Sequence, residues 1–232
     1  MHRCMMIVLA VAVTGAATAQ GVFSDVMSGA LIEPEVGVFA WYELKDTQTA
    51  QRLFMRQAIV GKRQVGGKTG YYLETEVMPE VGFPIIYRML LTGPATDPAN
   101  VHEIMVKDGT QPVEHLSLDI LEEDDDEQEA ALRESLGKEM LKTPAGEIEC
   151  EHFTITRGEN ANEVWLNDDV RPMGIVKMVG ADGELILTRF GKGGPDAESA
   201  IERKLREQEA DDLKVEVSPG HSRNFSGKTT AE

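Results

Sequence analysis

Cys150 and His152 are the residues whose types and spacing come closest to a catalytic pair. A thiol becomes a strong nucleophile when a histidine base stands beside it, and two residues apart on a strand share one face. However, Cys150 also alternates with Ile148 along that strand, as a small buried apolar residue would. We therefore expect Cys150, and Trp165 from the following strand, to be buried. We predict no catalytic residue.

Residues 61–69, GKRQVGGKT, look like a phosphate-binding loop at first sight. That loop requires G-x-x-x-x-G-K-[ST] and runs from a strand into a helix. Here the position six residues before Lys68 is Lys62 instead of glycine, and the segment joins two expected strands. We predict a hairpin turn at Gly66 and Gly67, and no nucleotide site.

Neither the acidic residues nor the histidines follow a metal-binding pattern. The run at 122–127, EEDDDE, contains no glycine to turn the backbone around a calcium ion, so a solvated helix start is the better interpretation. No two histidines stand at i and i+4, and none lies near a second cysteine. His102 and His115 can meet across a hairpin, but they would supply only two ligands. We predict no metal and no cofactor.

Aromatic and methionine residues gather in the expected strands, many of which carry large apolar residues on both faces. Such a set can be an ordinary core, or it can line an adaptable cavity, because methionine fills irregular space. The candidate cavity residues are Phe39, Trp41, Tyr42, Phe54, Tyr72, Tyr87, Met89, Phe153 and Trp165.

The elements that would position these residues are mostly strands. Alternation of apolar and polar residues predicts ten of them, at 36–46, 50–63, 70–80, 84–93, 101–109, 112–121, 146–158, 162–169, 173–180 and 184–191. Glycine, proline, asparagine and aspartate mark the joints, and Asp182-Gly183 is a strong hairpin signal. Connections this short predict an antiparallel meander.

Three segments favour helix. Residues 22–31 can form a short amphipathic helix that ends at Glu33-Pro34. Residues 125–141 begin with acids, end with lysines and carry a 3.6-like apolar stripe, so a helix is expected there. Residues 195–213 form a third candidate, with Pro195 at its start. The polar residues 214–232 are expected to be a disordered tail.

The first nineteen residues have the composition of a secretory signal. A basic MHR is followed by the apolar run CMMIVLAVAV, and Ala17-Thr18-Ala19 fits the cleavage pattern before Gln20. An uncut membrane anchor is the alternative. Cleavage leaves a single domain at 20–213 with its tail, and one cysteine, so no internal disulfide is possible. It removes Arg3 and no acid, so the net charge of −17 becomes −18, which excludes nucleic acid as a partner and would suit a basic one.

Three segments resemble a pattern in a known superfamily. They are 144–153 (PAGEIECEHF), 164–166 (VWL) and 170–177 (VRPMGIVK), with weaker matches at Val36-Gly37 and 70–74. The pattern is similar to exported bacterial proteins of the LolA/LolB lipoprotein-localisation type, although Arg171 interrupts a place where proline usually follows valine directly. The resemblance implies a mainly β (α+β) fold: a strongly curved antiparallel half-barrel of about 9–11 strands. It also implies covering helices, with 125–141 as a plug, and an apolar cavity for acyl chains.

The sequence therefore favours a soluble, exported, periplasmic protein that binds a lipid, acyl chain or other apolar ligand and catalyses no reaction. An envelope interaction module is the first alternative, with acidic helices that bind a basic partner protein. A hydrolase is the second; it would need two facing carboxylates or a Ser/His pair in the cavity, and no G-x-S-x-G elbow supports it.

Overall fold

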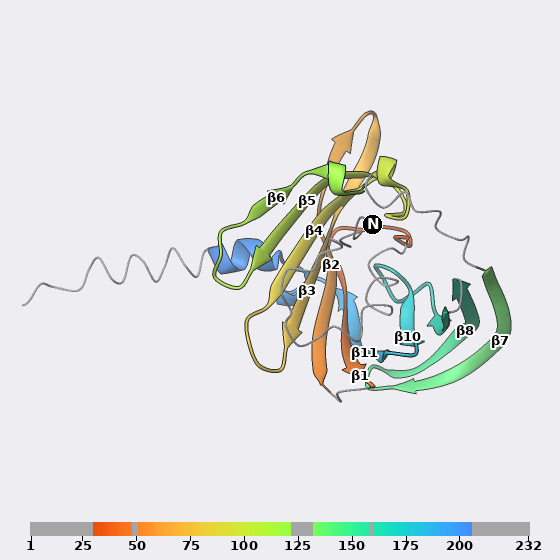
Figure 1. Cartoon of the computed structure of the whole chain (residues 1–232). Helices are drawn as coiled ribbons and strands as arrows, with labels where there is room; N and C mark the ends of the chain where they lie inside the picture. Colours follow the sequence, from red (N-terminus) through yellow and green to blue (C-terminus); the bar gives the residue numbers. More distant parts are fainter. Residues whose placement is uncertain (1–29, 48–50, 122–131, 158–159, 206–232) are drawn as a thin grey trace, which may run out of the picture.

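The described part of the chain forms one antiparallel sheet of eleven strands (Figure 1). The computed structural model describes residues 30–47, 51–121, 132–157 and 160–205. The strands are β1 (Val38–Asp46), β2 (Arg52–Val65), β3 (Lys68–Pro79), β4 (Ile85–Leu91), β5 (Val101–Asp108), β6 (Glu114–Leu116), β7 (Leu132–Thr143), β8 (Gly146–Arg157), β9 (Asn160–Leu166), β10 (Ile175–Val179) and β11 (Gly183–Lys192). Short 3₁₀ turns stand at η1 (Pro98–Asn100), η2 (Leu118–Leu121) and η3 (Pro195–Ala197).

The sheet consists of two meanders joined at one seam. Its order is β6-β5-β4-β3-β2-β1-β11-β10-β9-β8-β7, so every pair of neighbours is consecutive in sequence except β1 and β11. That seam runs from Val38 opposite Lys192 to Asp46 opposite Gly183, with a bulge between Trp41 and Tyr42. The sheet curves strongly but does not close, because β6 and β7 remain at its two edges (Figure 1).

The predicted strands and turns are largely confirmed. Alternation located ten of the eleven strands, although the one expected at 112–121 is only β6 followed by η2. Residues 61–69 are the β2–β3 hairpin as expected. Gly66 and Gly67 adopt φ of 56° and 84°, as a tight turn with two left-handed residues requires.

The predicted helix at 125–141 is wrong wherever the structure can be compared with it. Residues 132–143 form β7, which pairs with β8 along its length, and residues 125–131 lie outside the described part. The apolar stripe that favoured a helix is not a packing face, because Leu132, Leu136 and Met140 are all exposed. Positions four residues apart fit a strand as well as a helix, because four is a multiple of the strand period of two. The bulge between Ser135 and Gly137, with Gly137 at φ 104°, puts Leu132 and Met140 on opposite faces of the sheet.

The expectation of covering helices is also wrong for the described residues. A helix over 195–213 was predicted; the described residues have a helical segment at 200–205, and 206–213 lie outside the described part. Among these residues no helix is long and apolar enough to cross a membrane. The predicted signal segment, the helix at 22–31 and the tail at 214–232 fall almost entirely outside the described ranges; residues 30 and 31 are not helical.

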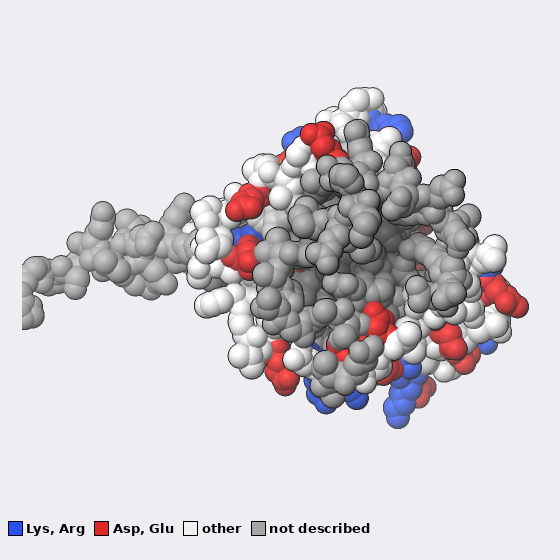
Figure 2. Space-filling view, in the orientation of Figure 1, with Lys and Arg blue, Asp and Glu red and all other residues white. Residues whose placement is uncertain are grey.

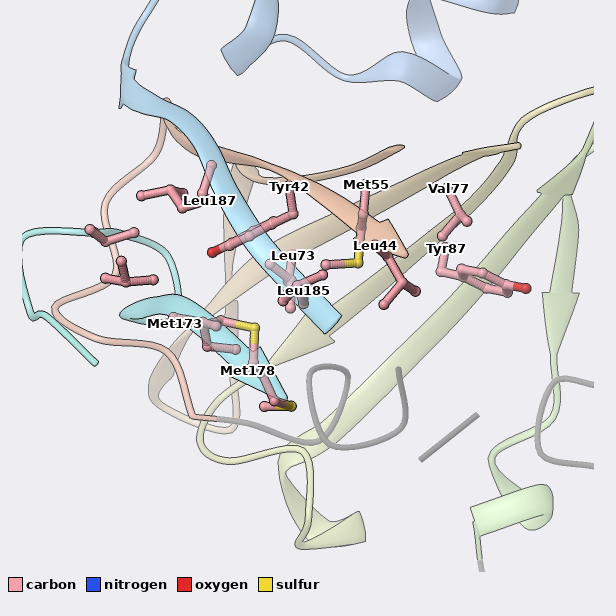
Figure 3. Close-up of a cluster of buried hydrophobic side chains, with 14 of the residues drawn as sticks. Tyr42, Leu44, Met55, Leu73, Val77, Tyr87, Met173, Met178, Leu185 and Leu187 are labelled. Atoms are coloured by element: carbon pink, nitrogen blue, oxygen red, sulfur yellow. The ribbon is translucent and has the colours of Figure 1, made fainter. Parts of the chain in front are cut away.

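The two faces of the sheet carry different cores. We call the face that bears Tyr42 and Leu187 the inner face; its side chains belong to one large apolar cluster that spans both meanders (Figure 3). The short helical segment lies on the opposite, outer face, where Ala200 and Ile201 pack with Ile86 in a second, smaller cluster.

A buried ionic clamp fastens residues 196–200 to the outer face. Arg56 on β2 and Glu74 on β3 have fully buried side chains, and Arg56 Nη2 lies 2.6 Å from Glu74 Oε1. Arg56 Nε is 3.2 Å from Glu76, which stands opposite it in the β2–β3 register. Its remaining nitrogen, Nη1, donates to the carbonyl oxygens of Asp196 (2.8 Å) and Glu198 (3.0 Å).

Glu74 completes the clamp from the other side. Its carboxylate accepts the hydroxyl hydrogen of Ser199 at 2.8 Å and the backbone N–H of Ala200 at 2.6 Å. The Ser199 hydroxyl also accepts the backbone N–H of Glu202 at 3.2 Å, so Ser199 is the N-cap of the helical turn. The charge pair is thus fully hydrogen-bonded, which is the condition under which a buried ion pair is tolerated.

Loss of Arg56 should therefore destabilise the protein strongly. We expect Arg56→Ala to lower the free energy of unfolding by about 3–5 kcal/mol, because Glu74 would remain buried without its counterion. The control is Arg52→Ala on the same strand. Arg52 is 53% exposed in its ion pair with Glu43, so its loss should cost less than about 1 kcal/mol. Urea unfolding curves would measure both, and similar losses for the two variants would contradict this role.

Candidate binding face

The inner face is a set of cross-strand apolar rows. Tyr42 on β1 stands opposite Met55 on β2 and Leu187 on β11. Across the sheet toward β4, Met55 stands opposite Val77 on β3, and Val77 stands opposite Ile85 on β4. In the second meander Met178 joins Leu185 to Val164. Directly opposed residues of an antiparallel sheet share a face, so these rows form one continuous apolar surface (Figure 3).

The structure places only part of the predicted cavity set on this face. Tyr42, Tyr87 and Trp165 belong to the inner cluster, and Met89 packs against it. Phe153 shares the face by register, opposite Val164, and the guanidinium of Arg133 lies 3.6 Å from its ring centroid.

The other predicted residues lie elsewhere, which sequence alternation alone could have indicated. Phe39 and Trp41 are odd-numbered neighbours of Tyr42 on β1 and so occupy the outer face. Trp41 lies under the guanidinium of Arg189, at 4.8 Å. Phe54 stands opposite Glu43 and is 38% exposed, and Tyr72 donates its hydroxyl hydrogen to Glu103 at 3.3 Å.

Three side chains bring polar groups to the apolar inner face; the prediction named Tyr42 but missed Gln57 and Thr75. Gln57 on β2 stands opposite both Ala40 and Thr75, and Thr75 stands opposite Tyr87, so both residues belong to this face. Gln57 is 0% and Thr75 1% exposed. Both amide atoms of Gln57, the Thr75 hydroxyl and the Tyr42 hydroxyl are buried and have no hydrogen-bond partner in the part of the chain that the structure describes. Buried polar groups are normally bonded, so this set requires an explanation.

Burial also keeps the inner-face tyrosines protonated. It raises the pKa of Tyr42 well above its usual value. It raises the pKa of Tyr87 to about 12, with a smaller contribution from Asp108. The Tyr42 hydroxyl therefore remains a neutral hydrogen-bond donor and acceptor at physiological pH.

Cys150 and Trp165 are both buried, as predicted, and His152 is not placed to activate the thiol. The His152 ring stacks on Trp165 at 4.2 Å, with Nδ1 3.4 Å from Glu139 and Nε2 3.2 Å from Glu163. The Trp165 indole N–H donates to Glu139 as well. Cys150 instead donates its S–H to the carbonyl oxygen of Ile148, 3.4 Å away. Both ring nitrogens of His152 thus face carboxylates.

A hollow of about 270 Å³ lies beside this cluster, but its lining is mostly charged or polar. The lining residues are Arg133, Lys138, Glu149, Cys150, Glu151, Leu166, Asn167, Asp168 and Asp169. Lys138 lies 3.6 Å from Glu149 and 4.0 Å from Glu151, so the charges in the hollow partly compensate one another. An apolar ligand would find little to contact here.

No group of three or more His, Cys, Asp or Glu side chains that could hold a metal ion occurs in the described ranges. The two histidines that might have met across a hairpin are separate in the register. His115 stands opposite Met105, three residues beyond His102, while His102 Nε2 is 2.8 Å from the hydroxyl of Thr92. The acidic run at 122–127 lies outside the described residues.

No protein-family model matches the chain, and a search of curated proteins finds no match. Among solved structures, a candidate lipoprotein from Parabacteroides distasonis aligns with a TM-score of 0.36 at 11% identity, over 70% of this chain and 99% of that one. A candidate exported protein with a YmcC-like fold from Bacteroides fragilis aligns at 0.38 and 12%, over 71% and 100%. MucB aligns at 0.39 and 10%, over 82% of this chain and 62% of its own. We transfer no residue role from them, and the LolA/LolB resemblance stays a prediction.

The Cys150 thiol should be unreactive in the folded protein. Burial, with a smaller effect of the Glu139 charge, raises its pKa from 9.0 to about 11, so the thiol is neutral at pH 8. Labelling by a thiol reagent at pH 8 should be slow in buffer and fast in denaturing urea. Because the pKa is raised on folding, this thiol stabilises the fold fully below about pH 9 and less as pH rises toward 11. Rapid labelling without urea would contradict the burial.

Proposed function

We propose that this protein is an exported binding protein that holds an acyl chain or another apolar ligand against the inner face and catalyses no reaction. The observation that carries the proposal is the extent of the inner apolar cluster, which draws on strands of both meanders of a sheet that stays open at β6 and β7. The helical turn among the described residues lies on the other face, so it takes no part in covering this surface.

The residue types of this face suit a ligand of variable shape. Met55, Met173 and Met178 belong to the inner cluster and Met89 packs against it. Methionine is unbranched, so it can follow the outline of different chains with little strain. Transfer of each methylene group from water gives about 0.8 kcal/mol, so a chain of about ten methylenes would offset a substantial cost of ordering.

The outer-face clamp supports the same proposal, because it stabilises the sheet without using the inner face. Arg56 and Glu74 tie the centre of the first meander to residues 196–200 without using any inner-face side chain. The strands that would contact a ligand are therefore held in register independently of what lies against the inner face.

An inner-face substitution should block uptake where an outer-face substitution does not. Met89 is partly exposed and packs against the inner cluster, so we expect Met89→Trp to occupy ligand space and weaken uptake of a fluorescent fatty acid about tenfold or more. Phe54→Trp on the outer face is the matched control and should bind normally. Mass spectrometry of protein purified from its native host should also find bound lipid. Reproducible absence of lipid together with no uptake by wild type would refute the proposal.

A second candidate, an envelope interaction module, is favoured by the edge strand β7. Eleven of the twelve residues of β7 are exposed or partly exposed. Among them, Leu132 is 73%, Leu136 52% and Met140 61% exposed. A long edge strand with apolar side chains can pair with an extended segment of another chain. The acidic side chains, by contrast, are scattered over the visible described surface in Figure 2 and form no single patch there.

If β7 receives a partner strand, a charge on it should prevent the pairing. We expect Leu136→Lys to abolish cross-links between β7 and envelope proteins in the native host. Phe83→Lys, which replaces another exposed apolar residue in the β3–β4 connection, should leave them intact. Identical cross-linking patterns in the two variants would exclude β7 as the interaction edge.

A further inference from the structure

The three unpartnered polar residues of the inner face lie in one place. Gln57 stands directly opposite Thr75. Tyr42 is the diagonal neighbour of Gln57, because Gln57 pairs with Ala40, two residues before Tyr42 on β1. In Figure 3 the ring of Tyr42 extends away from Leu44. The amide and the two hydroxyl groups thus form one polar spot within an apolar surface.

The surroundings of this polar spot are electrically neutral. Its inner-face neighbours by register are uncharged: Ala40 and Leu44 on β1, Met55 on β2, Leu73 and Val77 on β3, Tyr87 on β4 and Leu187 on β11. A charged group placed here would lose its hydration and find no counterion among these side chains, which is strongly unfavourable. A purely apolar group would leave four donor or acceptor atoms buried without partners.

We propose that the polar spot of Tyr42, Gln57 and Thr75 recognises a neutral head group that both donates and accepts hydrogen bonds, such as a carboxamide, on the ligand of the inner face. This inference rests on the proposed function and specifies the ligand. The Gln57 amide supplies two N–H donors and one carbonyl acceptor, and each hydroxyl can take either role. An amide head can therefore satisfy several of these atoms at once while its alkyl chain lies on the apolar rows.

Stability and affinity should move in opposite directions when the polar spot is removed. Gln57→Leu replaces a buried, unbonded amide by an apolar side chain of similar size. In the ligand-free protein it should raise Tm by about 2–4 °C, because the cost of the unsatisfied group is lost. The same substitution should weaken binding of an amide head about fivefold to tenfold. A residue with a purely structural role would show no such opposition.

The test compares dodecanamide, methyl dodecanoate, dodecanoate and dodecane as competitors of a fluorescent alkyl probe, using delipidated mature protein. Wild type should bind dodecanamide most tightly, and both Gln57→Leu and Thr75→Val should lose that preference while dodecane binding stays unchanged. Met55→Leu, an apolar exchange on the same face, is the control and should keep the preference.

The outcomes separate the two proposals. If dodecane competes but wild type does not prefer dodecanamide, the polar-spot inference fails while the binding function stands. A fall in Tm for ligand-free Gln57→Leu also overturns the inference, because the amide would then have a bonding partner in the protein. If no competitor displaces the probe, or the probe itself does not bind, both proposals fail.

Discussion

The contact between Arg56 and Glu74 is the interaction on which the first meander depends. Both side chains are fully buried, and the idealised cost of moving two ions out of water is large enough that only complete hydrogen bonding makes the pair tolerable. That completeness comes from a distant part of the chain, since Asp196, Glu198, Ser199 and Ala200 supply backbone and hydroxyl partners. The ion pair therefore specifies where the segment after β11 must lie.

This constraint follows from the geometry of the sheet. β11 pairs with β1, next to β2, so the chain that leaves β11 is already close to the strand that carries Arg56. The glycines Gly193 and Gly194, with φ of 79° and 71°, turn the backbone there into η3. A sheet with two apolar-rich faces must cover both, and on the outer face the clamp fastens this short segment over Ile86. The seam and the clamp act together to hold the first meander.

Much of the fold was predictable from local pattern, and the failures have physical reasons. Strand alternation and turn residues are local signals, so ten strands and the Gly66-Gly67 turn could be located. β7 could not, because the four-residue spacing of Leu132, Leu136 and Met140 fits a helix as well as a strand, and acids and lysines flank it as they would a helix. Pairing with β8 is a long-range interaction that overrides such local preference.

The candidate site was less predictable because it depends on register. Residue type alone favoured Phe39, Trp41 and Tyr42 together. Tyr42 directly follows Trp41, however, so its side chain lies on the opposite face of the strand from those of Phe39 and Trp41. Nothing in the sequence distinguishes Gln57 or Thr75, because each is an ordinary residue for a half-exposed strand. Only the pairing of β2 with β3 shows that they stand opposite one another on a buried face. Buried polar residues that lack a hydrogen-bond partner can be recognised only once their cross-strand neighbours are known.

Strands β2 and β3 carry buried polar residues on both faces: those on the outer face are hydrogen-bonded, whereas Gln57 and Thr75 on the inner face are not. Arg56 precedes Gln57, and Glu74 precedes Thr75, so each buried ion has an unbonded polar group as its next residue. On the outer face Glu76 and the segment 196–200 supply the partners that the ion pair needs. On the inner face the neighbouring strands supply apolar side chains and Tyr87, and none of these is bonded to Gln57, Thr75 or Tyr42. Since leaving buried donors and acceptors unpaired costs about 1–3 kcal/mol each, a core that served packing alone would be more stable with leucine and valine at these positions. A molecule that brings its own donor and acceptor removes that cost only when it is bound, which couples the stability of the first meander to the presence of the ligand.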